Sequence, residues 1–176
     1  MFNDILSLNY PKFKLAILGL LALNVLIYAM VDTLTSAADA LAWLVLLVMF
    51  ELEAADNRAL IAENTLHAIR NVLIAVIVLV FISYIHADEW LDVINGILWF
   101  ALIALLELEI RWPKKVTKHK QGFWAATIAM FIALIGMVAV WLWRSEWLDA
   151  YDAALWIAAF AVIEVDIFRF LQLKRN

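Results

Sequence analysis

Residues 95–109 read NGILWFALIALLELE, with an amide, a tryptophan and two acids inside an otherwise apolar run. The same arrangement occurs in residues 39–53, DALAWLVLLVMFELE, and in residues 152–166, DAALWIAAFAVIEVD. The tryptophans of successive copies are 56 and 57 positions apart. A unit of that length therefore occurs three times, which predicts a chain built from tandem repeats.

Each copy carries the same polar, aromatic and acidic positions. Carboxylates in sequence apolar enough for lipid are costly, so they are candidates for a functional role. The polar and aromatic positions are Asp39, Asn95, Asp152, Trp43, Trp99 and Trp156. The acid pairs, which are the candidate residues for binding protons or cations, are Glu51 with Glu53, Glu107 with Glu109, and Glu164 with Asp166.

The composition of the chain is that of an integral membrane protein. Hydrophobic residues make up 67% of the sequence, charged residues 17%, and the mean hydropathy is +0.92, whereas soluble proteins are roughly half apolar and a quarter charged. The 176 residues accommodate about six helices of around 20 residues with short turns, and no separate soluble domain. We therefore expect a single membrane domain that spans residues 1–176.

Several function classes are disfavoured by what the sequence lacks. Cysteine is absent, which excludes disulfides, thiolate metal sites and cysteine nucleophiles. The sequence has no P-loop, Gly-rich nucleotide turn, nucleophile elbow or HExxH motif, so an enzyme is the less favoured interpretation. No basic patch of the kind that binds nucleic acid is found, and the residues identify neither a cofactor nor a specific metal.

Six apolar runs predict six transmembrane helices and an all-α fold. The runs are continuous and lack the alternation of a membrane β-barrel. Taken in pairs, they form three helical hairpins, with repeat units at about residues 12–58, 65–113 and 122–173 and approximate pseudo-threefold symmetry. The predicted helices cover residues 15–31, 37–55, 66–85, 91–110, 123–143 and 150–171.

The turns inside the hairpins also repeat. Residues 88–92 read DEWLD and residues 145–149 read SEWLD, while residues 32–36, DTLTS, occupy the same place in the first unit. Asp, Ser and Thr side chains commonly cap helix N-termini. We therefore expect their oxygens in these turns to cap the second, fourth and sixth helices. Pro11 and Pro113 are expected at or outside helix ends, where a missing N–H does no harm.

The distribution of basic residues predicts the orientation in the membrane. With both termini in the cytoplasm, twelve basic residues lie on the cytoplasmic side and only Arg144 lies outside, a strong positive-inside signal. The predicted location is the bacterial inner membrane, with an outer aromatic belt of Trp90, Trp143, Trp147 and Tyr151. The cytoplasmic set is Lys12, Lys14, Arg58, Arg70, Arg111, Lys114, Lys115, Lys118, Lys120, Arg169, Lys174 and Arg175. Residues 111–120, with five of these, are predicted to form a loop that attracts anionic lipid.

The acid pairs have two interpretations. They can reach the cytoplasmic interface or pair with arginines, as the i,i+4 spacing of Glu107 and Arg111 allows. Alternatively, three hairpins around an axis bring one acid of each pair together, where carboxylates in low dielectric take up protons or bind a hard cation. The two acids of a pair lie about 200° apart on a helix, so only one set can face inward. We expect that set to be Glu51, Glu107 and Glu164.

Two function classes follow. The first is a small channel or carrier that binds and moves protons or hard cations through the repeated acids. The alternative is a non-catalytic accessory or assembly subunit whose Trp-rich helix faces pack on another membrane protein. In both cases the lipid bilayer is a partner, and a membrane-protein partner or a homo-oligomer is compatible with the sequence.

Overall fold

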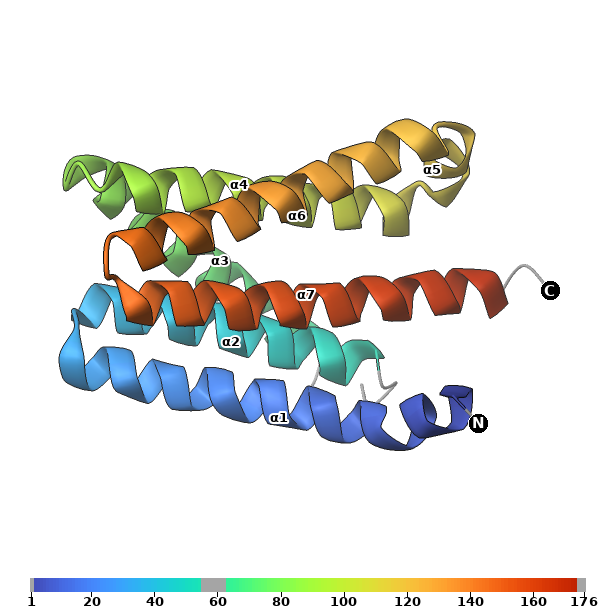
Figure 1. Cartoon of the computed structure of the whole chain (residues 1–176), viewed down its shortest axis with the longest axis horizontal. Coiled ribbons are helices and arrows are strands. Elements are labelled where there is room, and N and C mark those ends of the chain that lie inside the picture. The colour runs from blue at the N-terminus through green and yellow to red at the C-terminus, as the bar shows by residue number, and fades with distance from the viewer. Residues whose placement is uncertain (1, 55–62, 174–176) are drawn as a thin grey trace. The chain divides into compact units, whose positions relative to one another are not determined.

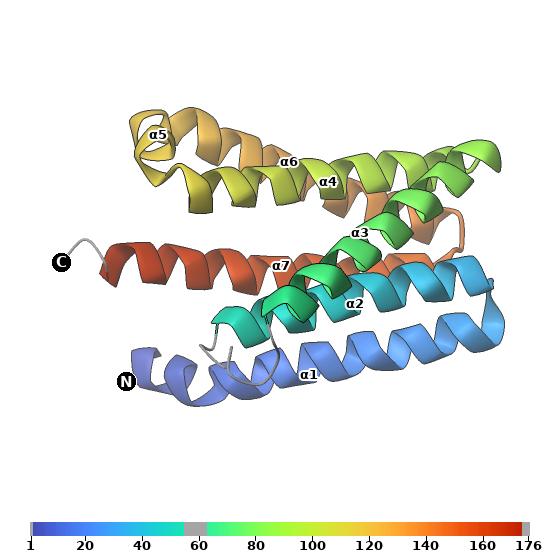
Figure 2. The same ribbon diagram turned by 180° about the vertical axis from the view of Figure 1, so that it is seen from behind.

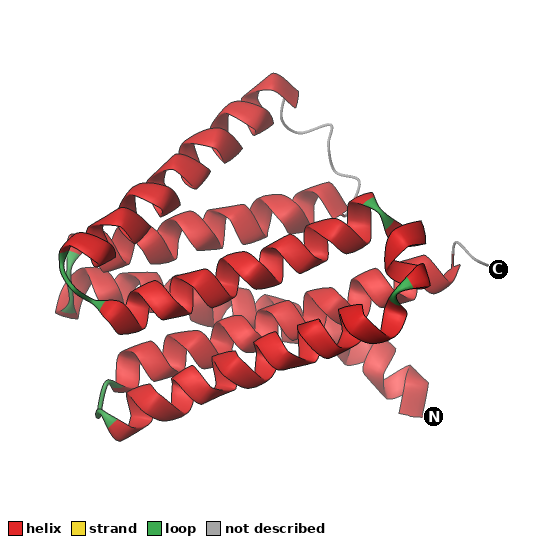
Figure 3. Cartoon of the chain, turned by 90° about the horizontal axis from the view of Figure 1, so that it is seen from above, coloured by secondary structure: helices red, strands yellow, loops and turns green. Residues whose placement is uncertain are grey.

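The computed structural model describes the backbone of residues 2–54 and 63–173, and its side chains except those of residues 2–12, 50–54, 63, 110, 113 and 163–173. All regular structure in the described backbone is helical (Figure 3), which confirms the predicted all-α class. The helices are α1 (Phe2–Val31), α2 (Leu34–Ala54), α3 (Glu63–His86), α4 (Trp90–Arg111), α5 (Pro113–Lys118), α6 (Lys120–Trp143) and α7 (Trp147–Leu173).

Five of the long helices begin and end within three residues of their predicted bounds, but two features differ. The first is α1, which starts at Phe2 and contains Pro11, so the prediction that Pro11 lies at or outside a helix end is wrong. The second is α5, an additional short helix inside the predicted basic loop. Pro113 begins α5, where its missing N–H would lack a partner in any case, as expected.

The chain divides into two compact units, and the division within α1 falls between Tyr10 and Pro11. Proline removes one backbone hydrogen bond from a helix and favours a bend there. The first unit comprises Met1–Tyr10 with Trp90–Asn176, and the second comprises Pro11–Glu89. The second boundary thus lies in the turn between α3 and α4.

In the unit formed by Pro11–Glu89, α2 packs along α3, and Figure 2 shows α3 crossing α2. Its buried side chains are mainly aliphatic, including Leu21 of α1, Leu47 of α2 and Ile77 of α3. Asn24 of α1 is fully buried. A fully buried amide is a feature of interhelical contacts in membrane proteins.

In the unit that contains α4 to α7, α6 contacts both α4 and α7 (Figure 1). The core includes Met137 and Trp141 of α6 packed with Ala150 and Ala153 of α7. Alanines on α7 allow the two backbones to approach closely, and the bulky side chains of α6 fill the space above them. Leu91 and Leu98 of α4 and Val138 of α6 pack against this cluster.

Four helices of the described chain are long and apolar enough to cross a membrane: Phe13–Val31, Asn64–His86, Trp90–Glu109 and Lys120–Trp143. Leu34–Met49 is a shorter apolar helix. Large aliphatic side chains on these helices are exposed, for example Leu79 at 66% and Ile132 at 64%. Soluble proteins rarely expose large contiguous apolar surfaces, so these surfaces are consistent with an integral membrane protein.

The turns that follow α3 and α6 have the same backbone structure. Asp88 and Ser145 adopt positive φ values of 58° and 62°, and the same two hydrogen bonds close each helix in a Schellman motif. These bonds run from the N–H of Glu89 to the carbonyl of Tyr84 (3.0 Å), from Asp88 to Ile85 (3.4 Å), from Glu146 to Trp141 (2.9 Å) and from Ser145 to Leu142 (3.2 Å). The repeated sequence in these turns therefore corresponds to repeated local structure.

The predicted N-caps are confirmed in one turn and wrong in two. Thr33 precedes α2, and its Oγ1 accepts a hydrogen bond from the N–H of Ser36 at 3.1 Å, which is an N-cap bond. Asp88 and Ser145 lie two residues before the helices that they were expected to cap, because α4 begins at Trp90 and α7 at Trp147. They instead end the preceding helices, where positive φ is required.

Candidate functional site

One face of α4 carries the repeat residues and is buried. Asn95, Trp99, Leu102, Leu106 and Glu109 follow one another at intervals of four and three residues, the spacing of a single helix stripe. Trp99 is 8% exposed, Leu102 1% and Leu106 9%. The middle of the stripe is therefore buried, and Glu109 lies at its C-terminal end.

The two acids of α4 have different environments. Glu109 is half-buried, and its Oε2 is a buried atom that has no hydrogen-bond partner among the described residues. Glu107 is exposed, and its Oε2 accepts a hydrogen bond from Nε of Arg111. The local ion pair expected from the i,i+4 spacing is thus present. The inward acid of this repeat is Glu109, so our expectation that Glu107 faces inward is wrong.

The reason for the difference is the helical rotation of about 200° between residues i and i+2. Trp99, Leu102 and Leu106 turn one side of α4 toward its neighbours, and Glu109 continues that side. Glu107 consequently points to the opposite side, where the long side chain of Arg111 reaches it. The same rotation applies to any pair with this spacing.

Two further buried oxygens in this unit have no hydrogen-bond partner in the described part of the chain. They are Oδ1 of Asn95 on α4 and Oγ1 of Thr127 on α6. Thr127 is 8% exposed, and α4 and α6 are in contact. Buried polar atoms are nearly always paired with protein or ordered water, so these oxygens are available to accept hydrogen bonds from a bound molecule or water.

Two of the three repeat tryptophans converge on one aromatic ring. The ring centroid of Phe160 on α7 lies 5.0 Å from that of Trp99 on α4 and 6.2 Å from that of Trp156 on α7. The planes are tilted by 51° and 53°, which suits favourable aromatic packing. The contact between Trp99 and Phe160 joins α4 to α7, whereas Trp156 and Phe160 both belong to α7. Trp43 is half-buried on α2 in the other unit.

The exposure of equivalent positions repeats along α4 and α7. With an offset of 57 residues, three pairs are buried, four pairs are exposed, and Asn95 and Asp152 are both half-buried. The buried pairs are Val93 with Ala150, Trp99 with Trp156, and Leu102 with Ala159, and the exposed pairs are Trp90 with Trp147, Ile94 with Tyr151, Ile97 with Ala154, and Ala104 with Ala161. Equivalent residues thus lie on equivalent faces of the two helices.

Helix α2 follows part of the same pattern at an offset of 56 residues from α4. Ala37 is buried, Asp39 is half-buried, and Leu41 and Val48 are exposed, as are their equivalents in α4. Trp43 is half-buried, whereas Trp99 is buried. The agreement is therefore closer between α4 and α7 than between α2 and α4.

The other four acids lie outside the described side chains. Glu51 and Glu53 belong to the end of α2, and Glu164 and Asp166 belong to the second half of α7. In sequence register, Glu53 and Asp166 correspond to Glu109. Among the described residues, no group of three or more His, Cys, Asp or Glu side chains is placed to hold a metal ion.

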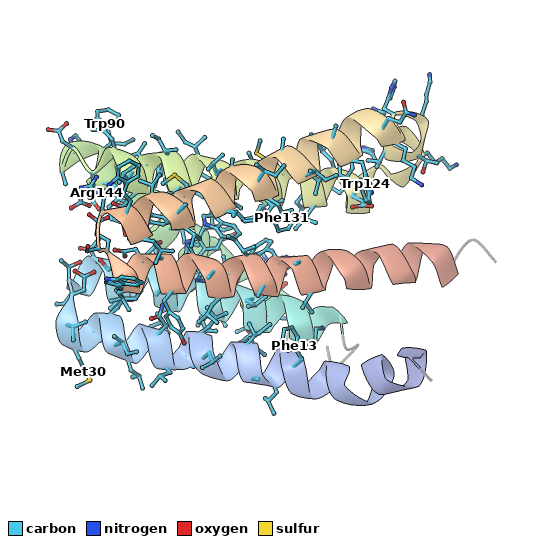
Figure 4. The ribbon with its side chains drawn as sticks, viewed as in Figure 1. Phe13, Met30, Trp90, Trp124, Phe131 and Arg144 are labelled. Carbon is cyan, nitrogen blue, oxygen red and sulfur yellow. The ribbon has the colours of Figure 1, made fainter. Side chains whose placement is uncertain are left out.

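The end of the unit where α6 meets α7 carries exposed aromatic side chains. Figure 4 shows Trp90 and Arg144 at this end. Trp143 is 92% exposed, Trp147 67% and Trp90 58%. Nε of Arg144 lies 3.0 Å from Oε1 of Glu146, an ion pair that the sequence interpretation did not anticipate.

Thr127 was also missed, although it is the one hydroxyl-bearing residue in the run from 123 to 143. Its position as an isolated polar residue in an apolar helix was the feature of the sequence that could have identified it.

Comparison with protein-family models, with curated proteins and with solved structures finds no match to this chain.

Proposed function

We propose that this chain is a six-span protein of the bacterial inner membrane, with both termini in the cytoplasm, that binds and passes protons through one inward acid in each of three hairpin repeats. The observation that carries the proposal is the buried Oε2 of Glu109, which has no hydrogen-bond partner among the described residues. The acid ends a helix stripe in which Trp99, Leu102 and Leu106 are buried. Such an acid is a functional candidate when its helix lies in a membrane.

Energetics support proton binding at this position. Glu109 is the last residue of the apolar span Trp90–Glu109, so its ionised form costs less than the roughly 2.5 to 3.5 kcal/mol of a carboxylate at the centre of a membrane helix, and protonation removes much of that cost. A neutral carboxyl can donate one hydrogen bond and accept others. A group that alternates between these two states can take up a proton from one side and release it to another.

A proton fits the described residues better than a multivalent cation does. Calcium takes six to eight oxygen ligands, and magnesium requires nearly octahedral coordination. No group of three acidic or histidine ligands is found in the part of the chain whose side chains are described. One carboxyl, by contrast, is sufficient to carry a proton.

The repeat extends the proposal to two further acids. The shared exposure pattern of α4 and α7 and the matching turns after α3 and α6 support equivalent roles for equivalent residues. In that register we assign the same role to Glu53, Glu109 and Asp166, which we call the inward set after Glu109. We call Glu51, Glu107 and Glu164 the outward set after Glu107, which is paired with Arg111.

The two acids of α4 provide a matched pair of variants. We expect proteoliposomes of the intact protein to acidify in response to an inward proton gradient, as reported by an enclosed pH-sensitive dye. Glu109→Gln should lower the rate at least tenfold, because it removes the titrating group and keeps the size of the side chain. Glu107→Gln should leave the rate within a factor of two. Equal loss in both variants would contradict the assignment of Glu109.

The accessory-subunit alternative is favoured by one observation, which is that Glu107 is exposed and paired with Arg111 in the manner of an interfacial residue. In that case the acids would serve solubility at the membrane surface and the exposed aromatic faces would contact another protein. The same proteoliposomes distinguish the two functions. Absence of proton and cation flux in the wild-type protein would favour the accessory subunit.

A further inference from the structure

A second surface of the same unit combines exposed lysines with exposed tryptophans. It surrounds α5, between the end of α4 and the start of α6, and we call it the basic corner. Figure 4 shows one of its two tryptophans, Trp124, at the end of α6 opposite Arg144. The side chains of the corner are all exposed. They are Lys114, Lys115, Lys118, Lys120, Trp112 and Trp124.

The charge of the basic corner is not neutralised by nearby acids in the sequence. No Asp or Glu occurs from residue 110 through residue 145. Glu107 is the neighbouring exposed acid of α4, and it pairs with Arg111 rather than with a lysine. The four lysines therefore present a surface of one sign, which attracts anions.

The exposed tryptophans of α6 suggest that the basic corner lies at one interface of a bilayer. Trp124 and Trp143 are exposed at opposite ends of α6 and are 19 residues apart, which is about 28 Å along a helix. The exposed residues between them include Ile128, Ile132 and Ile135. A distance of about 28 Å is close to the hydrocarbon thickness of a bilayer, and tryptophans favour its two interfaces.

A cation–π contact joins a lysine and a tryptophan of the basic corner. Nζ of Lys115 lies 5.5 Å from the ring centroid of Trp112, a distance at which an ammonium group is attracted to the ring face. Trp112 is 50% exposed, so the contact holds one lysine beside an aromatic side chain that suits the headgroup region. The remaining lysines lie within six residues of it in the sequence.

From this arrangement we propose that the basic corner binds the headgroups of anionic phospholipids. Lysine is a compact cation suited to phosphate, and each basic residue near an anionic membrane surface strengthens the attraction. The tryptophans supply the neighbouring contact with the acyl-chain boundary. This function is separate from proton binding, because it involves none of the repeat acids.

Lipid titration of the full-length protein in neutral detergent tests the proposal. Dioctanoyl phosphatidylglycerol should raise the melting temperature of the protein, because a ligand that binds the folded state stabilises it. The melting temperature is measured by tryptophan fluorescence. Dioctanoyl phosphatidylcholine and inorganic phosphate should have much smaller effects. Replacing Lys114, Lys115, Lys118 and Lys120 by Gln should weaken the response to phosphatidylglycerol by at least roughly tenfold in concentration.

The matched control replaces the same four lysines by Arg, which keeps the charge and should preserve the response. Equal stabilisation by phosphatidylcholine would show that the corner does not select anionic headgroups. Equal stabilisation by phosphate would indicate a site for free anions. Either result, or an unchanged response in a folded Gln variant, would overturn the proposal, whereas loss of proton flux in Glu109→Gln would leave it unaffected.

Discussion

At the scale of single residues, burial distinguishes side chains that the sequence presents as equivalent. Glu107 and Glu109 have the same chemistry and lie two positions apart, yet one is exposed and ion-paired and the other has a buried oxygen. The ion pair itself contributes little, because exposed i,i+4 pairs are worth about 0.3 to 0.5 kcal/mol. The distinction between them arises from which face of α4 packs against its neighbours.

Ser145 allows a test at this scale. It adopts a φ of 62°, a conformation that glycine accepts without the steric cost paid by other residues. Ser145→Gly should therefore raise the free energy of unfolding by about 0.5 to 1 kcal/mol, measured by denaturation in micelles. Ser83, inside α3, donates a hydrogen bond from Oγ to the carbonyl of Val80 at 2.7 Å. Ser83→Gly should lower stability, and stabilisation by both variants would contradict the explanation.

At the scale of helices, the sequence predicted most boundaries because long apolar runs are interrupted by short polar turns. It did not predict the roles of Asp88 and Ser145, since the same residue types can begin one helix or end the one before it. The Schellman bonds of the folded chain decide between these roles. The direction of the acids was also beyond reach, because periodicity places two acids on opposite faces without showing which face is covered.

The start of α2 provides the test at this scale. Thr33 Oγ1 accepts the N–H of Ser36, so Thr33→Ala should lower the free energy of unfolding by about 1 kcal/mol. Thr33→Ser retains the oxygen and should restore most of this stability. Thr35, which is also exposed, offers a control whose replacement by Ala should have a smaller effect. Equal losses at Thr33 and Thr35 would show that the cap bond does not explain the change.

At the scale of the whole molecule, repetition links the turns, the exposure pattern and the acids. The helical class and the apolar lengths of four helices could be derived from composition and run length. Which acid of a pair is covered could not, because it depends on tertiary packing. The three-hairpin arrangement and the threefold symmetry remain predictions. The basic corner shows how neighbouring charge and exposed tryptophan can acquire a joint role once α5 and α6 are in place.

Membrane orientation can be measured by reporter fusions along the chain. Fusions after Arg58, Lys120 and Asn176 should report the cytoplasm, because twelve of the thirteen basic residues would lie on that side. Fusions at Ser36, Glu89 and Asp149 should report the opposite side. An external carboxyl terminus would mean that one of the six predicted spans does not cross the membrane.

Proton flux in proteoliposomes containing either of two register-matched triple variants tests the central claim most directly. Glu53→Gln, Glu109→Gln and Asp166→Asn together should abolish the flux of the wild-type protein, because all three inward carboxyls lose their titrating protons. Glu51→Gln, Glu107→Gln and Glu164→Gln together should retain it within a factor of two. Retention of flux in the first variant, with both variants folded and inserted, would contradict proton transfer through the inward acids.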